Sequence, residues 1–141
     1  MKHESKTTAA EVIREIGDLY IVKIKKETEA IGIKNAYRPL LSALYSEDGG
    51  TQLSLAQRTG IKAPTVSITL RKMEKEGIVD RVVDESDLRK THVYLTEKGK
   101  KLTLDMNKCI AGINAIFTAE MNKEQKEFFL SSLDRIKESL K

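Results

Sequence analysis

The strongest constraint on the fold comes from residues 51–95, where two helical patterns meet at one glycine and are followed by two runs of β-branched residues. Thr51 is placed to cap a short helix that extends to about Thr59, and a longer helix is expected from Ala63 to Glu76. Gly60 lies between the two helices and allows a tight turn there. This order of elements predicts two helices that cross closely, followed by a small amount of sheet.

The spacing of small and aliphatic residues across this turn is typical of a helix-turn-helix. Ala56 is small enough for the second helix to cross closely, Gly60 makes the turn, and Val66 closes the contact. The β-branched runs Ile78–Val83 and Thr91–Leu95 flank a charged loop, which predicts a β-hairpin with a projecting tip. Together these elements predict a winged helix-turn-helix.

Positive charge gathers in the same part of the chain. Residues 51–101 hold eleven Lys or Arg and seven Asp or Glu, so this segment carries the whole net charge of +4. The stretch from Arg58 to Lys72 contains four cations and no acid. A cluster of one sign on a compact segment indicates a phosphate-binding surface, with a merely solvated charged face as the alternative.

The helix expected after Gly60 has one inner and one outer face. Placing Val66 inward brings Leu70 and Met73 to the same side, because successive residues turn by about 100°. The major groove of DNA admits one helix, so we expect the opposite face to meet base edges and phosphates, with Ile68 near a thymine methyl. A surface helix with one stray apolar residue is the alternative. The predicted contacts here are Lys62, Pro64, Thr65, Ser67, Ile68, Arg71 and Lys72.

Apolar periodicity predicts two helices before this segment. The first covers Ala9 to about Ala30 and ends at Gly32. The second covers roughly Asn35 to Tyr45, and Pro39 should make its first turn irregular or delay its start. The apolar stripe of the first helix is wider than one small domain can cover, which indicates a further packing partner.

Two more helices are predicted after the hairpin. Thr96 caps a long helix with apolar residues nearly every 3.5 positions, and Asn122 with Gln125 resembles the capping box of a last helix. Phe129 and Leu133 begin a regular apolar stripe on that last helix. The predicted fold class is mainly α with a small β-hairpin wing, a winged helix-turn-helix joined to a helical dimerisation region.

Composition argues against several classes of protein. The start from Met1 to Lys6 is polar and no run of about 18 apolar residues occurs, so we expect a cytoplasmic protein without membrane contact. Cys109 with only His3 and His92 makes a poor set of metal ligands, and no cofactor is expected. We expect Cys109 to be a core residue rather than a redox sensor. No nucleophile–base pair or pair of carboxylates stands out, so no catalytic residue and no enzyme is predicted.

The central segment resembles the MarR (multiple antibiotic resistance regulator) family of transcription factors. Helix order and chain length also match that family. The Asp-x-Arg wing element followed by Leu-Thr-x-x-Gly is fairly specific among winged helices. The matching residues are Thr51-Gln52, Leu55-Ala56, Gly60-Ile61, Thr65-Val66-Ser67, Leu70, Met73-Glu74, Gly77-Ile78-Val79, Arg81, Asp87-Leu88-Arg89, Leu95-Thr96 and Gly99.

The resemblance implies roles for the wing residues. Asp87 would brace the wing, Arg89 would enter the minor groove of DNA, and Arg81 would support the base of the wing. Lys90 joins Asp87 and Arg89 in the expected DNA-contacting set. The chain departs from many members at Ile68 and Ser86, where they have Arg, and at Lys62, where they have a Ser or Thr cap. The operator sequence therefore cannot be taken from relatives.

The resemblance also implies partners and a division of the chain. It predicts a sequence-specific regulator, a ligand-responsive repressor that binds a pseudo-palindromic operator as a homodimer, with recognition helices about 34 Å apart. A small-molecule effector would bind near Tyr37, Arg38 and Tyr45, for which core or surface roles are the alternative. Residues 1–141 form one domain, with 33–101 as the winged part and 7–31 and 102–141 as the dimerisation part. A winged-helix module that binds protein or RNA is the alternative function.

Overall fold

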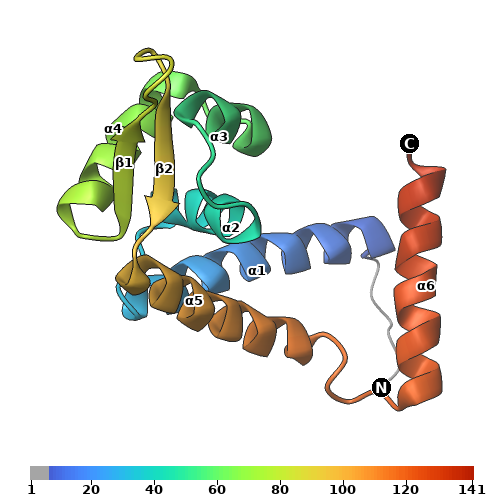
Figure 1. Ribbon diagram of the computed structural model, residues 1–141. Helices are drawn as coiled ribbons and strands as arrows, with labels where there is room; N and C mark the ends of the chain where they lie inside the picture. Colours follow the sequence, from blue (N-terminus) through green and yellow to red (C-terminus); the bar gives the residue numbers. More distant parts are fainter. Residues whose placement is uncertain (1–6) are drawn as a thin grey trace.

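The computed structural model describes residues 7–141 and has the predicted mainly helical architecture with one hairpin (Figure 1). Met1–Lys6, with His3, lie outside the described residues. Within the described part, no helix is long and apolar enough to cross a membrane. The elements in chain order are α1 (Ala9–Ala30), the 3₁₀ turn η1 (Asn35–Tyr37), α2 (Arg38–Ser46), α3 (Gln52–Thr59), α4 (Ala63–Lys75), β1 (Val79–Val83), β2 (Thr91–Leu95), α5 (Glu97–Ile116) and α6 (Lys123–Ser139).

Side-chain caps fix the starts of α3 and α6 at the predicted residues. The Thr51 hydroxyl accepts the amide of Ser54 at the start of α3, over 3.1 Å. The Asn122 and Gln125 side chains each accept the other residue's amide, over 2.9 Å, so the predicted capping box is present in α6. These contacts satisfy amides that a helix cannot pair internally, which is why local sequence sets the boundaries so closely.

The second predicted helix begins late, as Pro39 indicated. Asn35–Tyr37 form a 3₁₀ turn, and the regular helix starts only at Arg38, with Pro39 in its first turn. Proline is acceptable there because the first amides of a helix have no partner inside the helix. The helix then runs to Ser46, one residue beyond the predicted end.

The helix-turn-helix packs through the three predicted residues. Gly60 adopts φ +71°, and its amide donates to the Ala56 carbonyl over 3.0 Å. A side chain at this backbone angle would be strained, so glycine suits the turn. Ala56 and Val66 are both buried, together with Leu55. The crossing of α3 and α4 therefore rests on a small residue, a left-handed glycine and an aliphatic contact.

The hairpin is antiparallel, and its register pairs Val79 with Leu95 and Val83 with Thr91. The connection between α2 and α3 adds a short third pairing that the sequence did not indicate. The Gly49 amide donates to the Val93 carbonyl over 2.9 Å, and an isolated bridge joins the next residues to β2. The wing is therefore hydrogen-bonded to the start of the helix-turn-helix as well as to itself.

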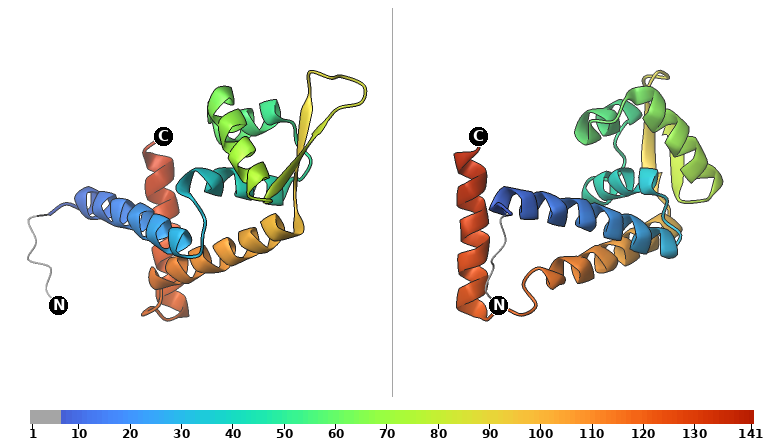
Figure 2. Two further views of the ribbon diagram at one scale, coloured as in Figure 1. Left: turned by 90° about the vertical axis from the view of Figure 1, so that its left-hand side faces the viewer. Right: turned by 180° about the vertical axis from the view of Figure 1, so that it is seen from behind.

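One continuous core lies under the winged part. It includes residues of η1, α2, α3, α4, both strands and α5. Below it, α1 and α5 lie side by side, and α6 stands across their far ends (Figures 1 and 2). Although α6 is described in full, none of its residues is buried. The chain therefore has one well-packed body and one helix with little cover.

Gly99 sits where the first turn of α5 meets the backbone of Ile78, directly before β1. A methyl group on Gly99 would overlap the Ile78 carbonyl and crowd Leu95. The Thr96 hydroxyl beside it accepts the Gly99 amide over 3.0 Å and lies 2.6 Å from the Gly77 carbonyl. The Leu-Thr-x-x-Gly motif therefore docks the start of α5 against the end of α4.

We predict that Gly99→Ala lowers the free energy of unfolding by about 1 to 3 kcal/mol, the usual cost of overpacking against rigid backbone. Gly112→Ala is the matched control, because a methyl group there meets nothing within 4 Å, closer to the C-terminal end of the same helix. The control should gain about 0.5 to 1 kcal/mol from helix propensity. Urea denaturation at one protein concentration measures both, and equal effects would contradict this account of Gly99.

Candidate nucleic-acid interface

Helix α4 has the two faces that its sequence predicted. Val66, Leu70 and Met73 are fully buried, so they fix the helix against the core. Thr69 is also buried, and its hydroxyl donates to the Thr65 carbonyl over 2.8 Å. On the outer side Ile68 is 53% exposed, an unusual position for a large aliphatic residue. Ser67 is half-buried, and the exposed residues around Ile68 are Pro64, Thr65, Arg71 and Lys72.

The cations of this face are free to meet a ligand. Within residues 7–141, Lys62, Arg71 and Lys72 form no ion pair. Lys62 occupies the cap position of α4 in an extended conformation, and its side chain forms no cap hydrogen bond. The first turn is thus uncapped, as the departure from Ser or Thr predicted. Unpaired cations beside open helix amides are suited to phosphate.

The wing loop, residues 84–90, presents Arg89 to solvent. Its guanidinium donates to both oxygens of Asp87, from Nε over 3.0 Å and from Nη2 over 3.3 Å. The Arg89 side chain is 91% exposed, and its pairing lowers the pKa of the Asp87 carboxyl. Asp87 therefore orients Arg89 directly, and Lys90 is exposed beside it. Figure 1 shows the wing loop at the same end of the molecule as the start of α4.

Arg81 ties the wing to α4. It lies in β1, and its Nη2 donates to the Glu74 carboxylate of α4 over 3.0 Å. This hydrogen bond is the main reason that the pKa of Glu74 is lowered. The structure thus contains the support at the wing base that the resemblance implied. Arg81 also neutralises Glu74, which lies on α4 away from its outer face.

A contact at the base of the loop was missed by sequence reasoning. The Asp84 carboxylate accepts both the amide and the hydroxyl of Ser86, over 2.8 and 2.6 Å, and the amide of Asp87 over 2.9 Å. Its other oxygen meets His92 Nε2 at 2.7 Å. The spacing of Asp84 and Ser86 is typical of an Asx turn and could have indicated the first part. Asp84, more than Asp87, therefore organises the loop.

The candidate effector residues are separated by their burial. Tyr37 is 1% exposed and belongs to the core, so it fits the alternative interpretation rather than an open cleft. Arg38 is half-buried and its guanidinium donates to the Asn35 side chain. Tyr45 is exposed on α2. Of the three candidates, Arg38 and Tyr45 keep side-chain surface that a ligand could reach.

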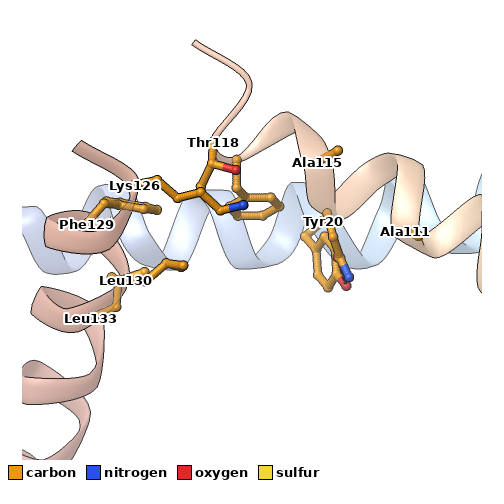
Figure 3. Close-up of a pocket in the computed structure, with 10 residues that line it drawn as sticks. Tyr20, Ala111, Ala115, Thr118, Lys126, Phe129, Leu130 and Leu133 are labelled. Atoms are coloured by element: carbon orange, nitrogen blue, oxygen red, sulfur yellow. Dashed lines mark hydrogen bonds between the residues drawn. The ribbon is translucent and has the colours of Figure 1, made fainter. Parts of the chain in front are cut away.

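A second feature lies between α6 and the paired helices α1 and α5. A cavity of about 440 Å³ opens there, with Phe129 and Leu133 on one side and Tyr20 on the other (Figure 3). The Tyr20 hydroxyl donates to Asn114 over 2.7 Å, and its ring meets Phe117 edge-on at 5.5 Å between centroids. Apolar side chains on both walls thus face open space within a single chain.

Cys109 is half-buried between α5 and α1, with its sulfur 3.7 Å from the Glu27 carboxylate. Burial, and then the nearby Glu27 charge, raise the pKa of the Cys109 thiol. A raised pKa disfavours the reactive thiolate. This environment supports the packing role expected for Cys109.

This chain is similar in sequence and structure to known proteins of one family. A family profile described as MarR family matches residues 31–90. The crystal structure of a MarR transcriptional regulator from Methanosarcina mazei Go1 matches with a TM-score of 0.74 and 34% identity, covering 92% of this chain and 94% of that one. MepR, a transcription regulator of the Staphylococcus aureus multidrug efflux pump MepA, matches with a TM-score of 0.87 and 26% identity, covering 96% and 100%.

A MepR–DNA complex from the same organism also matches, with a TM-score of 0.73 and 26% identity, covering 95% of this chain and 99% of that one. These similar proteins are transcription regulators, and the correspondence extends over almost the full length of each chain. The 34% identity with the Methanosarcina protein extends across nearly all of both chains. The chain belongs to the MarR family of transcription regulators.

Proposed function

We propose that the protein is a sequence-specific, DNA-binding transcription regulator that acts as a homodimer on a pseudo-palindromic operator. The observation that carries the proposal is the outer face of α4, where unpaired Arg71 and Lys72 flank the exposed Ile68, beside a wing that presents Arg89. Cations and hydroxyls on one helix suit the phosphates and base edges of a major groove. The similar MepR, solved with DNA, supports this use of the fold.

In this proposal, most of the predicted residues either read base edges or contact phosphates, and two others shape or position them. Thr65, Ser67, Ile68 and Arg71 read base edges, while Lys62, Lys72 and Lys90 contact phosphates. Pro64 shapes the first turn of α4 against the groove. Asp87 positions Arg89 for the minor groove. The winged part at 33–101 binds the duplex, and the segments 7–31 and 102–141 form the dimer.

Homodimer formation is supported by the apolar surface that one chain leaves open. Leu19 and Val22 of α1 are more than half exposed, and so is Phe128 of α6. A lone helix gains most of its stability from packing an apolar face, and α6 has little such packing within its own chain. A second copy can cover these faces and fill the gap beside α6. Two-fold symmetry then produces two equivalent recognition helices.

We further propose that the protein is a cytoplasmic repressor that a small molecule releases from DNA. A dimer that covers an operator blocks access to it, which is the simplest route from binding to regulation. An effector that binds between the helical part and the winged part would change the distance between recognition helices. Arg38 and Tyr45 are the accessible candidates for such a contact.

Selection of bound duplexes from a random library, followed by a salt series on the selected sequence, tests the main proposal. The expected result is an enriched sequence with two inverted half-sites about 10 base pairs apart, and an affinity that falls steeply with salt. Failure to enrich any duplex would reject it. Retention of structured RNA or of a protein partner instead would favour the alternative of a protein- or RNA-binding winged module.

Arg89→Ala should weaken binding by about 1 to 3 kcal/mol, the scale of a good base contact, while fold and dimer stay intact. The exposed position of Arg89 is the reason that the fold should tolerate the change. The loss should be greatest where the operator flank under the wing is rich in A·T pairs. Two operators that differ only in this flank make the comparison. An equal loss on both would reduce Arg89 to a phosphate contact.

Arg71→Ala and Lys72→Ala should weaken binding in different ways. Loss of a base-reading residue relaxes the preference among sites, whereas loss of a phosphate contact weakens all duplexes and reduces the salt slope by about one unit. We expect the first behaviour for Arg71 and the second for Lys72. Binding curves on selected and scrambled duplexes at several salt concentrations measure both. Wild-type affinity in both variants would show that another face of the protein meets DNA.

Leu133→Asp should convert the dimer to monomers and abolish tight operator binding, because one half-site keeps only part of the contact energy. Leu133 lies on the apolar side of α6, beside the open cavity. Ser131→Asp is the control, since Ser131 is exposed two residues earlier on the same helix. Light scattering gives the mass of each variant at micromolar concentration. A wild-type protein with the mass of one chain would contradict the proposed dimer.

A further inference from the structure

The His92 imidazole lies between two groups that can only accept hydrogen bonds. Its Nδ1 is 2.9 Å from the Gly49 carbonyl oxygen, and its Nε2 is 2.7 Å from the Asp84 carboxylate. A neutral imidazole carries one N–H and can serve only one of these acceptors. Both hydrogen bonds require the doubly protonated, cationic ring. The geometry around His92 therefore selects the imidazolium form.

The carboxylate cannot supply the missing proton in place of the ring. Hydrogen bonds from Ser86, followed by the one from His92, hold the pKa of Asp84 well below its usual range. The second Asp84 oxygen already accepts two amides and a hydroxyl, all of which favour the charged form. Asp84 is thus a fixed anion, and the proton that closes the bridge belongs to His92.

The hydrogen-bonded bridge formed by Gly49, His92 and Asp84 joins three segments of the chain at the wing. Gly49 belongs to the connection between α2 and α3, His92 to β2, and Asp84 to the start of the wing loop. The loop continues directly to Asp87 and Arg89. When the ring is neutral, one acceptor faces a nitrogen lone pair, so either the contact to Asp84 or the contact to Gly49 is lost.

We propose that His92 is a pH-sensitive tether of the wing, which holds the loop carrying Arg89 in its DNA-binding position when the ring is protonated and loosens it when the ring is neutral. The inference rests on the DNA-binding function proposed above. A loose loop must be ordered when DNA binds, and that ordering reduces affinity. The protein would then bind its operator more tightly in mildly acidic than in alkaline conditions.

The direction of the effect follows from the charges around the ring. The hydrogen bond to Asp84, and then the one to the Gly49 carbonyl, raise the pKa of His92 above its ordinary value, while desolvation of the ring and then Lys90 oppose them. Asp84 and Lys90 are thus the charged groups acting on the ring, which is only partly shielded from water. Below the raised pKa the bridge is intact. As pH rises through the raised pKa, the bridge and the affinity that depends on it are lost.

Nuclear magnetic resonance of the free dimer tests the tether without DNA. The sequence has only two histidines, so a His92→Gln variant assigns the imidazole signals. We expect His92 to titrate above the ordinary value, and the amides of residues 84–90 to shift with the same midpoint. Asp84→Asn should move that midpoint to lower pH. Wing amides that ignore the titration of His92, or an ordinary midpoint for His92, would overturn the inference.

Binding to the selected operator tests the consequence. From about pH 6 to about pH 8.5, wild-type affinity should fall roughly three- to tenfold, the scale of the net contribution of one ordinary hydrogen bond. His92→Gln should bind at the weaker level throughout, with circular dichroism confirming its fold. Lys90→Gln is the charge-matched control, because it also removes one wing cation but keeps the bridge. This variant should bind more weakly than wild type at every pH, and its affinity should still fall as pH rises from about 6 to about 8.5.

The resonance experiment and the binding experiment together separate the proposed tether from the proposed DNA-binding function. A wild-type protein that binds no duplex at any pH rejects the proposed function, while the resonance experiment still decides whether His92 tethers the wing. Operator binding with the same pH dependence in wild type and His92→Gln overturns the inference and leaves DNA binding in place. A pH step without movement of the wing amides also overturns it, since a local charge on His92 alone would then explain the result.

Discussion

The junction around Thr96 determines how the parts of this molecule face one another. Its amide donates to the Ile78 carbonyl over 3.1 Å, its hydroxyl lies 2.6 Å from the Gly77 carbonyl, and Gly99 packs against the same backbone. Lys98 adds a contact to the Glu76 carbonyl over 2.6 Å. The end of α4, both ends of the hairpin and the start of α5 therefore meet at one point. The start of α5 is thus hydrogen-bonded directly to the segment that links α4 to the wing.

Sequence reasoning succeeded where the determinants are local and failed where they are not. Thr51 and Asn122 cap their helices through amides three residues away, so their signals are complete within one turn. The contact between His92 and Gly49 spans 43 residues and depends on how a loop lies beside β2. No periodicity indicates such a pairing. No sequence pattern indicates the pairing of residues 49–51 with β2 either, because it forms only when the tertiary fold brings the two segments together.

The placement of acids explains why a modest net charge yields a cationic face. Glu74 is paired with Arg81 and Glu76 with Lys34, over 3.0 and 2.9 Å, so both acids of α4 and its cap are engaged by partners away from the outer face. Asp87 is likewise paired with Arg89. Charge pairing of this kind contributes little to stability at a surface. Its consequence here is electrostatic, because the unpaired charges that remain around Ile68 are positive.

Exposed apolar residues have two different meanings in this chain. Ile68 is alone among polar and charged neighbours on α4, and a single exposed aliphatic costs little in water. It offers a methyl-sized contact without promoting association. The apolar residues of α1 and α6 instead form facing walls around an open gap. Extended apolar surface of that kind marks an interface. In the proposed function, the isolated Ile68 serves recognition and the continuous apolar surface of α1 and α6 serves assembly.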